Sequence, residues 1–120
     1  MTEVSITTDS SLKISVDHKG QDCLVLLNGR INIDSSPDLR DQLVAILSEA
    51  PLPLIVTVDL AAVSYIETSG IATLIEALRI AGQRKTRLQL RGLTGSVLRL
   101  FEVAGVLSLF ELPDEEEKVS

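Results

Sequence analysis

The chain has 120 residues, 11 Lys and Arg against 17 Asp and Glu, a formal net charge of −6 at pH 7, and only two Phe, one Tyr and no Trp, which fits one small domain with an aliphatic core. Its single cysteine, Cys23, and single histidine, His18, exclude an intrachain disulfide and a His/Cys metal site. No apolar run reaches the roughly 18 residues of a membrane span and the polar N-terminus lacks the regions of a signal peptide, so we expect a cytoplasmic protein with no direct membrane insertion.

The N-terminal part of the chain predicts strands. Residues 1–11 are polar and rich in Ser and Thr, so we expect either a flexible lead-in or an edge strand there. Leu12, Ile14 and Val16 alternate with polar residues, which is the period of a half-buried strand. The continuous apolar run at 23–27, followed by Asn28 and Gly29, predicts a second and more buried strand.

The first helix is predicted from its start signal. In residues 34–37, Asp-Ser-Ser-Pro, a Ser cap precedes a proline whose missing N–H costs nothing at the first helical position. An amphipathic helix follows, since apolar residues recur at helical spacing: Leu39, Leu43, Ile46 and Leu47. It is expected to end near Ala50, because Pro51 and Pro53 stop it.

The remaining elements alternate between strands and helices. Residues 54–60 are apolar on nearly both faces, as in a central parallel strand, and a helix is predicted from about Thr68 to Arg84. A strand at 87–91, a shorter helix that stops near Gly105, and a last short strand at 107–112 complete the pattern. The order β-β-α-β-α-β-α-β predicts one α/β domain over residues 12–112, with a mixed sheet and crossover helices packed on it. Residues 113–120 are expected to be an acidic disordered tail.

Signatures of chemistry are largely missing from the sequence. It contains neither a Gly-rich phosphate loop nor a nucleophile elbow, and Cys23 lies in an apolar strand, so we predict no catalytic residue, no metal and no cofactor. Residues 77–101 carry six basic groups and no acidic one, but Phe101 is the only aromatic residue there. We interpret this run as solvated surface and expect no nucleic-acid partner.

One segment carries a functional candidate. Thr68 and Ser69 fall at the predicted start of the second helix, where unpaired N–H groups and the positive end of the helix dipole favour an added negative charge. The residues alone leave two interpretations open: the hydroxyl is an N-cap, or it is presented to a partner. Gly70 permits either a close approach of another group or a tight turn.

The same segment resembles a known family. Asp59-Leu60, followed by residues 65–71, Tyr-Ile-Glu-Thr-Ser-Gly-Ile, resembles the signature of STAS domains of the anti-sigma factor antagonists, in which a strand ending in Asp-Leu leads to Asp-Ser-Ser-Gly-Leu or a close variant. Residues 29–32, Gly-Arg-Ile-Asn, fall where the family has Gly-Glu-Leu-Asp, and residues 35–43 and 98–110 resemble its first helix and its ending. The resemblance covers about residues 12–112.

This resemblance implies a partner-switching protein that binds an anti-sigma factor when unphosphorylated and so releases a sigma factor to regulate transcription. The anti-sigma factor in such families is itself a serine/threonine kinase with a histidine-kinase-like fold, and a PP2C-type phosphatase reverses the modification. By position, the phosphorylated residue is Thr68, with Ser69 as the alternative. The implied partner-binding residues are Asn32, Ser35, Glu67, Thr68, Ser69 and Gly70, and we expect a monomer or weak dimer.

The chain departs from the family at three positions: Thr68 replaces Ser, while Glu67 and Asn32 each replace Asp. A second hypothesis follows from the first departure. Some STAS domains that resemble this chain are non-catalytic regulatory subunits of ABC lipid transporters or parts of stress-sensing complexes, and Thr at this position is common among them. The ending of the chain favours the antagonist.

Overall fold

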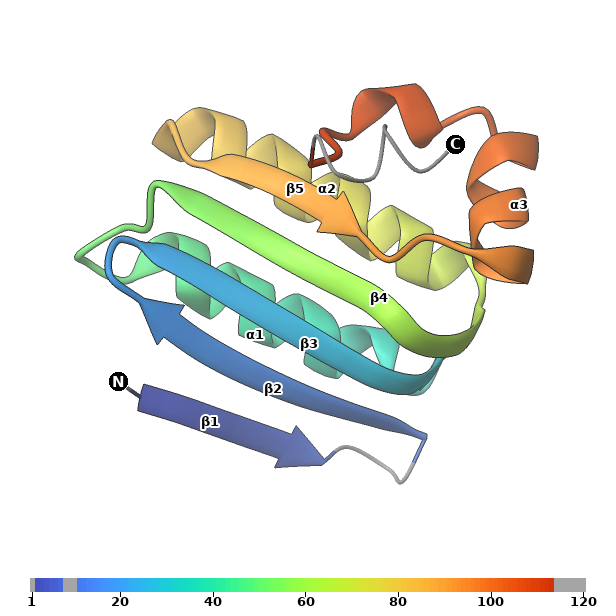
Figure 1. Ribbon diagram of the computed structural model, residues 1–120, viewed down its shortest axis with the longest axis horizontal. Helices are drawn as coiled ribbons and strands as arrows, with labels where there is room; N and C mark the ends of the chain where they lie inside the picture. Colours follow the sequence, from blue (N-terminus) through green and yellow to red (C-terminus); the bar gives the residue numbers. More distant parts are fainter. Residues whose placement is uncertain (1, 8–10, 114–120) are drawn as a thin grey trace.

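The sheet has five strands whose order in space follows their order in the chain (Figure 1). The computed structural model describes residues 2–7 and 11–113. β1 (Thr2–Thr7), β2 (Leu12–Lys19) and β3 (Asp22–Ile31) are antiparallel neighbours, whereas β4 (Ile55–Ile66) and β5 (Arg87–Arg91) continue the sheet parallel to β3. The predicted mixed sheet is confirmed. The N-terminal segment, for which the sequence leaves a lead-in or an edge strand open, contains the edge strand β1.

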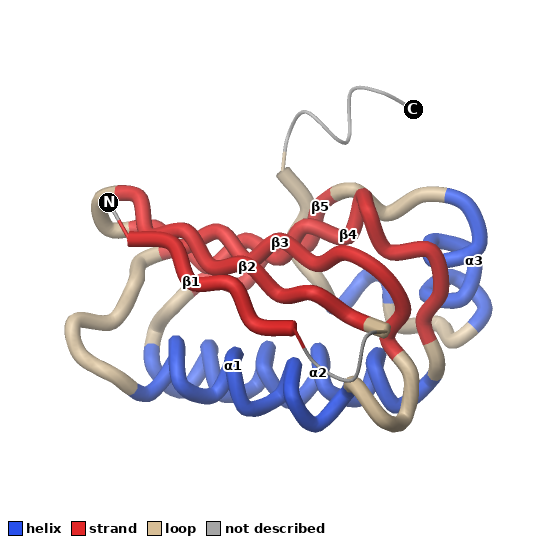
Figure 2. The backbone as a smooth tube through the Cα atoms, turned by 90° about the horizontal axis from the view of Figure 1, so that it is seen from below, coloured by secondary structure: helices blue, strands red, loops and turns tan. Residues whose placement is uncertain are grey.

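Two helices cover one face of this sheet. α1 (Ser36–Ser48) and α2 (Thr68–Arg84) lie side by side against it, and α3 (Gly95–Val103) lies beside the end of β4 (Figure 2). The alternation predicted for β2 is confirmed, because its apolar residues point toward the helices and are buried. The core between the layers is aliphatic and includes Leu12, Ile14, Val25, Leu27, Leu39, Leu43, Leu47, Val56, Val58 and Leu74.

The parallel pairing of β3 and β4 brings two distant loops together. Ile31, at the end of β3, is the register partner of Ile66, at the end of β4. Since parallel strands have their carboxyl ends at the same edge of a sheet, the loop before α1 and the loop before α2 emerge next to each other. The first turns of both helices therefore meet at one edge of the molecule.

The predicted last strand at 107–112 is wrong. Residues Leu107–Leu109 form a short 3-10 helix, and beyond it Glu111 makes an isolated parallel bridge with Gln89. Phe110 is buried edge-on against Phe101, with ring centroids 5.8 Å apart. The apolar residues of this segment thus serve to dock it beside β5, and the observed order is β-β-β-α-β-α-β-α. Beyond Pro113, the predicted acidic tail lies outside the described residues.

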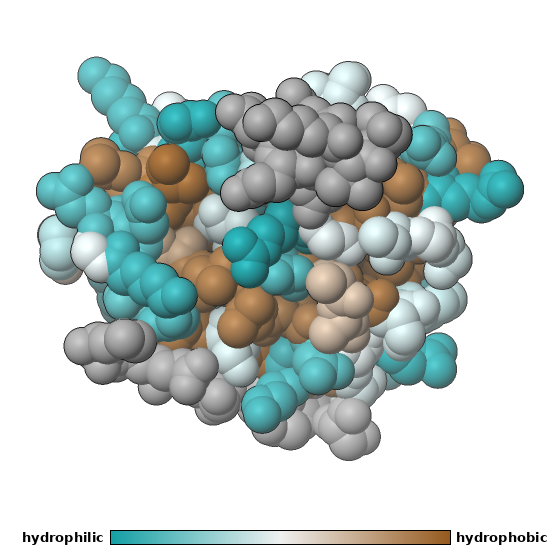
Figure 3. Space-filling view, viewed as in Figure 1, coloured by the Kyte–Doolittle hydropathy of each residue, from teal (hydrophilic) through white to brown (hydrophobic). Residues whose placement is uncertain are grey.

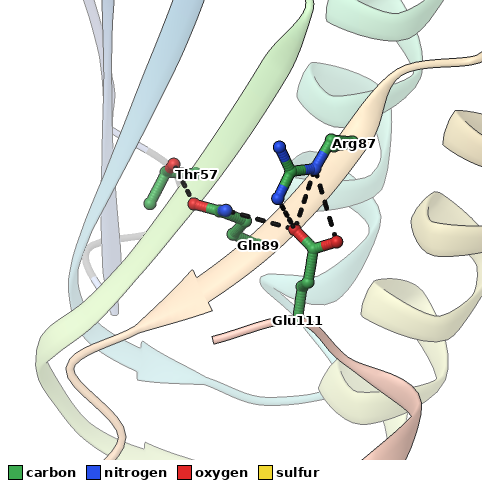
Figure 4. A network of polar contacts seen from close by, with 4 residues as sticks. All are labelled: Thr57, Arg87, Gln89 and Glu111. Atoms are coloured by element: carbon green, nitrogen blue, oxygen red, sulfur yellow. Dashed lines mark hydrogen bonds and ion pairs between the residues drawn. The ribbon is translucent and has the colours of Figure 1, made fainter. Parts of the chain in front are cut away.

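Polar contacts hold this C-terminal segment against β5 (Figure 4). The Arg87 guanidinium donates to the Glu111 carboxylate, with Nη2 2.8 Å from Oε1, and Gln89 Nε2 donates to the same oxygen at 3.1 Å. Thr57 on β4 continues the network by donating to Gln89 Oε1. These hydrogen bonds hold the pKa of the Glu111 carboxyl below its ordinary value, chiefly through Arg87.

The sheet face that α1 and α2 leave open mixes apolar and charged groups (Figure 3). The alternate residues of the central strands are half-buried on it, among them Leu24, Leu26 and Asp59. Asp59 Oδ2 accepts a hydrogen bond from Arg91 Nε at 2.8 Å. Arg87 and Arg91, two of the six basic groups between residues 77 and 101, are therefore paired with carboxylates, which reduces the positive potential of that run.

Candidate functional site

The predicted start of the second helix is confirmed, and it lies at the edge where the two loops meet. Glu67 occupies the N-cap position of α2 with an extended backbone, and Thr68 is the first helical residue. The Glu67 N–H donates to the Ile31 carbonyl at 2.9 Å, which ties the start of α2 to the end of β3. The N-cap interpretation of Thr68 is wrong, because the preceding residue holds that position.

Thr68 is exposed to solvent. It contributes to a shallow hollow of about 460 Å³, hereafter the Thr68 depression, which is lined by Ile33, Tyr65, Ile66, Glu67, Thr68, Ser69 and Leu100. Four of these residues come from the loop before α1, from β4 and from α3, so elements that are distant in sequence meet beside Thr68. The positive end of the α2 dipole lies at the same place. Thr68 is thus presented to solvent where added negative charge is tolerated.

The Ser69 hydroxyl is half-buried and points toward α1. Its Oγ lies 3.0 Å from Ser36 Oγ, and Ser36 Oγ donates to the Asn32 carbonyl at 2.6 Å. A serine hydroxyl has one proton, so Ser36 must accept in its contact with Ser69. The Ser69 proton is thereby used inside the protein, in contrast to the exposed Thr68 side chain.

The two carboxylate oxygens of Glu67 contact the loop before α1 and the end of β4. Oε1 accepts from the Ile33 N–H at 2.9 Å, and Oε2 accepts from the Tyr65 hydroxyl at 3.1 Å. The hydrogen bond to Glu67 and the charge of that carboxylate raise the pKa of Tyr65, while the Arg30 guanidinium, 4.8 Å from the ring centroid, opposes part of this shift. Glu67 therefore joins the start of α2 to the loop before α1 through Oε1 and to the end of β4 through Oε2.

The loop before α1 is organised by Asn32 and Ser35. Asn32 Oδ1 accepts from the N–H groups of Asp34 and Ser35, at 2.9 and 3.0 Å. The Ser35 hydroxyl accepts from the Asn32 N–H and donates to the Arg30 carbonyl. Ser35 is the N-cap residue of α1 but is fully buried, and its hydroxyl points back into the loop. Ser35, predicted to contact a partner, is placed with its side chain inside the loop, where it shapes the loop.

Gly70 is buried as well, and the structure decides between its two interpretations. A Cβ atom there would lie 2.5 Å from Ile31 Cγ2 and 2.9 Å from Ile66 Cγ1. Gly70 is therefore the position where α2 packs closely on the ends of β3 and β4. Gly70, also predicted to contact a partner, is buried in this packing contact. Asn32, Glu67, Thr68 and Ser69 keep at least part of their surface exposed.

Sequence reasoning missed three residues of this site: Arg30, Ile33 and Tyr65. Tyr65 was visible as the only tyrosine of the chain, two residues before Glu67. Ile33, which is 70% exposed, was visible as an aliphatic residue between Asn32 and Asp34. Neither signal predicts that both residues donate to the Glu67 carboxylate, and the contact with Ile33 joins residues 34 apart in the chain.

The described residues offer few other reactive groups. They contain no group of three or more His, Cys, Asp or Glu side chains that could hold a metal ion. Burial, with a smaller contribution from the Asp17 charge, raises the pKa of the Cys23 thiol to about 11, so the thiolate nucleophile is scarce near neutral pH. No helix within the described part of the chain is both long and apolar enough to cross a membrane.

The chain is similar to known proteins over most of its length. A family model described as "Mlab, STAS domain" matches residues 14–111. The anti-sigma-B factor antagonist of Listeria monocytogenes is 25% identical over 112 residues, which are 91% of this chain and 96% of that protein. The antagonist of the same name from Bacillus subtilis is 23% identical over 107 residues, covering 89% and 95% of the two chains.

Solved structures share the fold. The crystal structure of an anti-sigma factor antagonist from Mycobacterium paratuberculosis superposes with a TM-score of 0.75 at 19% identity, covering 95% of this chain and 97% of that one. The anti-sigma factor antagonist SpoIIAA in its unphosphorylated form has a TM-score of 0.73 at 14% identity, with 88% and 92% coverage. At these low sequence identities, the two structures are evidence for the shared fold alone.

Proposed function

The chain belongs to the STAS domain family, and on this premise we propose that it is an anti-sigma factor antagonist, a regulator of transcription that works by binding. The exposed hydroxyl of Thr68, at the first position of α2 and inside the Thr68 depression, carries this proposal. Relatives that cover nearly the whole chain and bear this name support it. The protein would act without catalysing a reaction, by sequestering an inhibitor of a sigma factor.

Thr68 is the proposed phosphorylation site, and Ser69 is the alternative. The kinase transfers the γ-phosphoryl group of ATP to Thr68 Oγ1, which loses its proton, and ADP leaves. A PP2C-type phosphatase then hydrolyses the ester to the hydroxyl and inorganic phosphate. The inward hydrogen bond of Ser69 favours Thr68, because the Ser69 oxygen would have to leave Ser36 before it could react.

The switch rests on electrostatics. A phosphate adds about −1.5 to −2 charges beside Glu67, where the α2 dipole tolerates the charge and the fold survives. A partner that fits the free hydroxyl would meet repulsion and a desolvation cost instead. A coupling of about 1–3 kcal/mol is enough to exchange one partner for another. The proposed partners in the cytoplasm are an anti-sigma factor with a histidine-kinase-like fold and the phosphatase.

The test is phosphorylation by the anti-sigma kinase encoded nearest to this protein, followed by site mapping. We expect ATP-dependent modification of Thr68, its loss in Thr68→Ala and its retention in Ser69→Ala. Thr68→Ala should bind the unphosphorylated kinase, and Thr68→Glu should bind at least about tenfold more weakly. Modification that persists in Thr68→Ala and disappears in Ser69→Ala would move the site to Ser69. Absence of both binding and modification would reject the antagonist.

The threonine at position 68 favours a second candidate. In this alternative the chain is a non-catalytic regulatory subunit of an ABC lipid transporter or of a stress-sensing complex. Purification of the tagged chain from its own cells separates the two functions. Recovery of a transporter ATPase supports the second candidate, whereas recovery of a histidine-kinase-like anti-sigma protein supports the first.

A further inference from the structure

The carboxylate of Glu67 links the first turn of α2 to the loop before α1. Its two oxygens accept from Ile33 N–H and Tyr65 O–H, at 2.9 and 3.1 Å, and its own N–H donates to the Ile31 carbonyl. The structure records no capping hydrogen bond from the Glu67 side chain within the described helix α2. The carboxylate is therefore committed to the neighbouring loop and strand.

The hydrogen bond from Ile33 to Glu67 affects a residue that lines the Thr68 depression. Ile33 is 70% exposed and lines the Thr68 depression together with Tyr65 and Leu100. An exposed loop residue is free to reorient unless its backbone is held, and the Glu67 carboxylate holds the N–H of this one. One apolar residue of the depression, Ile33, is thus held through its backbone by the charged residue that directly precedes Thr68 in the chain.

We propose that Glu67 is a positioning residue for the Thr68 depression: its carboxylate fixes Ile33 beside Thr68, and a negative group on Thr68 acts on Ile33 through that carboxylate. The second half of this inference rests on the proposed function, which supplies the phosphate. Glu67 and Thr68 are adjacent, so the two anions repel each other. Both Glu67 oxygens are already engaged, and the carboxylate can move away only by weakening a bond to Ile33 or Tyr65.

The length of the Glu67 side chain is what allows its carboxylate to reach the loop before α1. The family that this sequence resembles has Asp at this position, and Glu is longer by one methylene group. Here the longer side chain spans the space between the two loops and reaches the Ile33 N–H. Glu67→Asp keeps the charge but shortens the reach, so it should release Ile33 much as Glu67→Ala does.

Amide hydrogen exchange in the full chain tests the positioning role without any partner. We expect the Ile33 amide to exchange about tenfold faster in both Glu67→Ala and Glu67→Asp, because one hydrogen bond is lost. Glu102→Ala is the matched control, since it removes the same charge from an exposed position on α3. Unchanged amides in the core strand β4 exclude general unfolding. An Ile33 amide that is as protected in Glu67→Ala as in the unaltered chain would overturn the inference.

A double-substitution cycle tests the path of the effect. Thr68→Glu should speed exchange at Ile33 by about threefold or more, whereas the uncharged Thr68→Gln should leave it unchanged. In a Glu67→Ala background, Thr68→Glu should add nothing further. An equal effect of Thr68→Glu in both backgrounds would show that the charge reaches Ile33 without Glu67 and would reject the path. Because no kinase is present, the outcome is independent of whether the protein is an antagonist.

Discussion

The hydroxyl of Ser69 lies 3.0 Å from the hydroxyl of Ser36, and this contact joins the first turn of α2 to the first turn of α1. Ser36 is buried and donates its only proton to the Asn32 carbonyl, so Ser69 donates to Ser36. Thr68 and Ser69 are adjacent in sequence but differ in their surroundings. Thr68 is exposed to solvent, whereas the Ser69 hydroxyl binds Ser36 inside the protein.

Ser69→Ala should lower the free energy of unfolding by about 0.5–1.5 kcal/mol, because Ser36 loses its donor in a half-buried place. Thr68→Val is the matched control, as it removes an exposed hydroxyl of similar shape and should stay within about 0.5 kcal/mol of the unaltered protein. Urea unfolding of both variants makes the comparison. Equal stability of the two would contradict the inward role of Ser69.

Gly70→Ala should destabilise the protein by about 1–3 kcal/mol, since the new Cβ would lie 2.5 Å from Ile31 Cγ2 and the strand ends would have to shift. Gly82→Ala is its control in the same helix. A Cβ atom at Gly82 would meet no described atom within 4 Å outside its own stretch of helix, so this change should stabilise the protein by up to about 1 kcal/mol through helix propensity. Opposite signs in urea unfolding are the expected result.

Tyr65 provides a direct optical probe of the site, because it is the only tyrosine and the chain has no tryptophan. Its pKa is raised by the hydrogen bond to Glu67 and by the charge of that carboxylate. Glu67→Gln should lower the pKa of Tyr65 toward its ordinary value, while Thr68→Glu should raise it further. Ultraviolet absorbance of the tyrosinate against pH measures both shifts.

The raised pKa of Tyr65 also links alkaline stability to this contact. Because the folded protein binds the phenolic proton more tightly than the unfolded chain does, the contribution is complete below the unfolded pKa, about 10, and is lost as pH rises through the folded pKa. Tyr65→Phe should remove that part of the alkaline dependence. Parallel stability curves for Tyr65→Phe and the unaltered chain above pH 10 would speak against the Glu67 contact.

Glu111 should contribute to stability with the opposite pH dependence, at acid pH. Its folded pKa is lowered by Arg87 and Gln89, so its contribution is present above the unfolded value, about 4.3, and is lost as pH falls through the folded pKa. Both partners are about half exposed, and solvent screening limits the effect of Glu111→Gln near neutral pH to about 0.5 kcal/mol. The difference in unfolding midpoint between this variant and the unaltered chain should disappear at low pH.

The sequence correctly predicted those strands and helices whose apolar residues recur with a clear period. Alternation identified β2, and the repeat of apolar residues placed the start of α2 at Thr68. The segment at 107–112 shows where this reasoning fails. Its apolar residues fit a short strand, but burial of Phe110 against Phe101 and the Glu111 network dock it as a turn of 3-10 helix followed by a single bridge.

By itself, the sequence determined an α/β domain with an aliphatic core and a hydroxyl at the start of its second long helix, because periodicity and capping chemistry are local properties of the chain. Only the tertiary structure decided the rest of the site: that Ser35 and Gly70 are buried, that Ser69 points inward, and that Glu67 reaches Ile33. The physical reason is the parallel pairing of β3 and β4. It brings together two loops more than 30 residues apart. Whether a side chain in one loop stays exposed or forms a hydrogen bond depends on the donors and acceptors that the other loop places beside it.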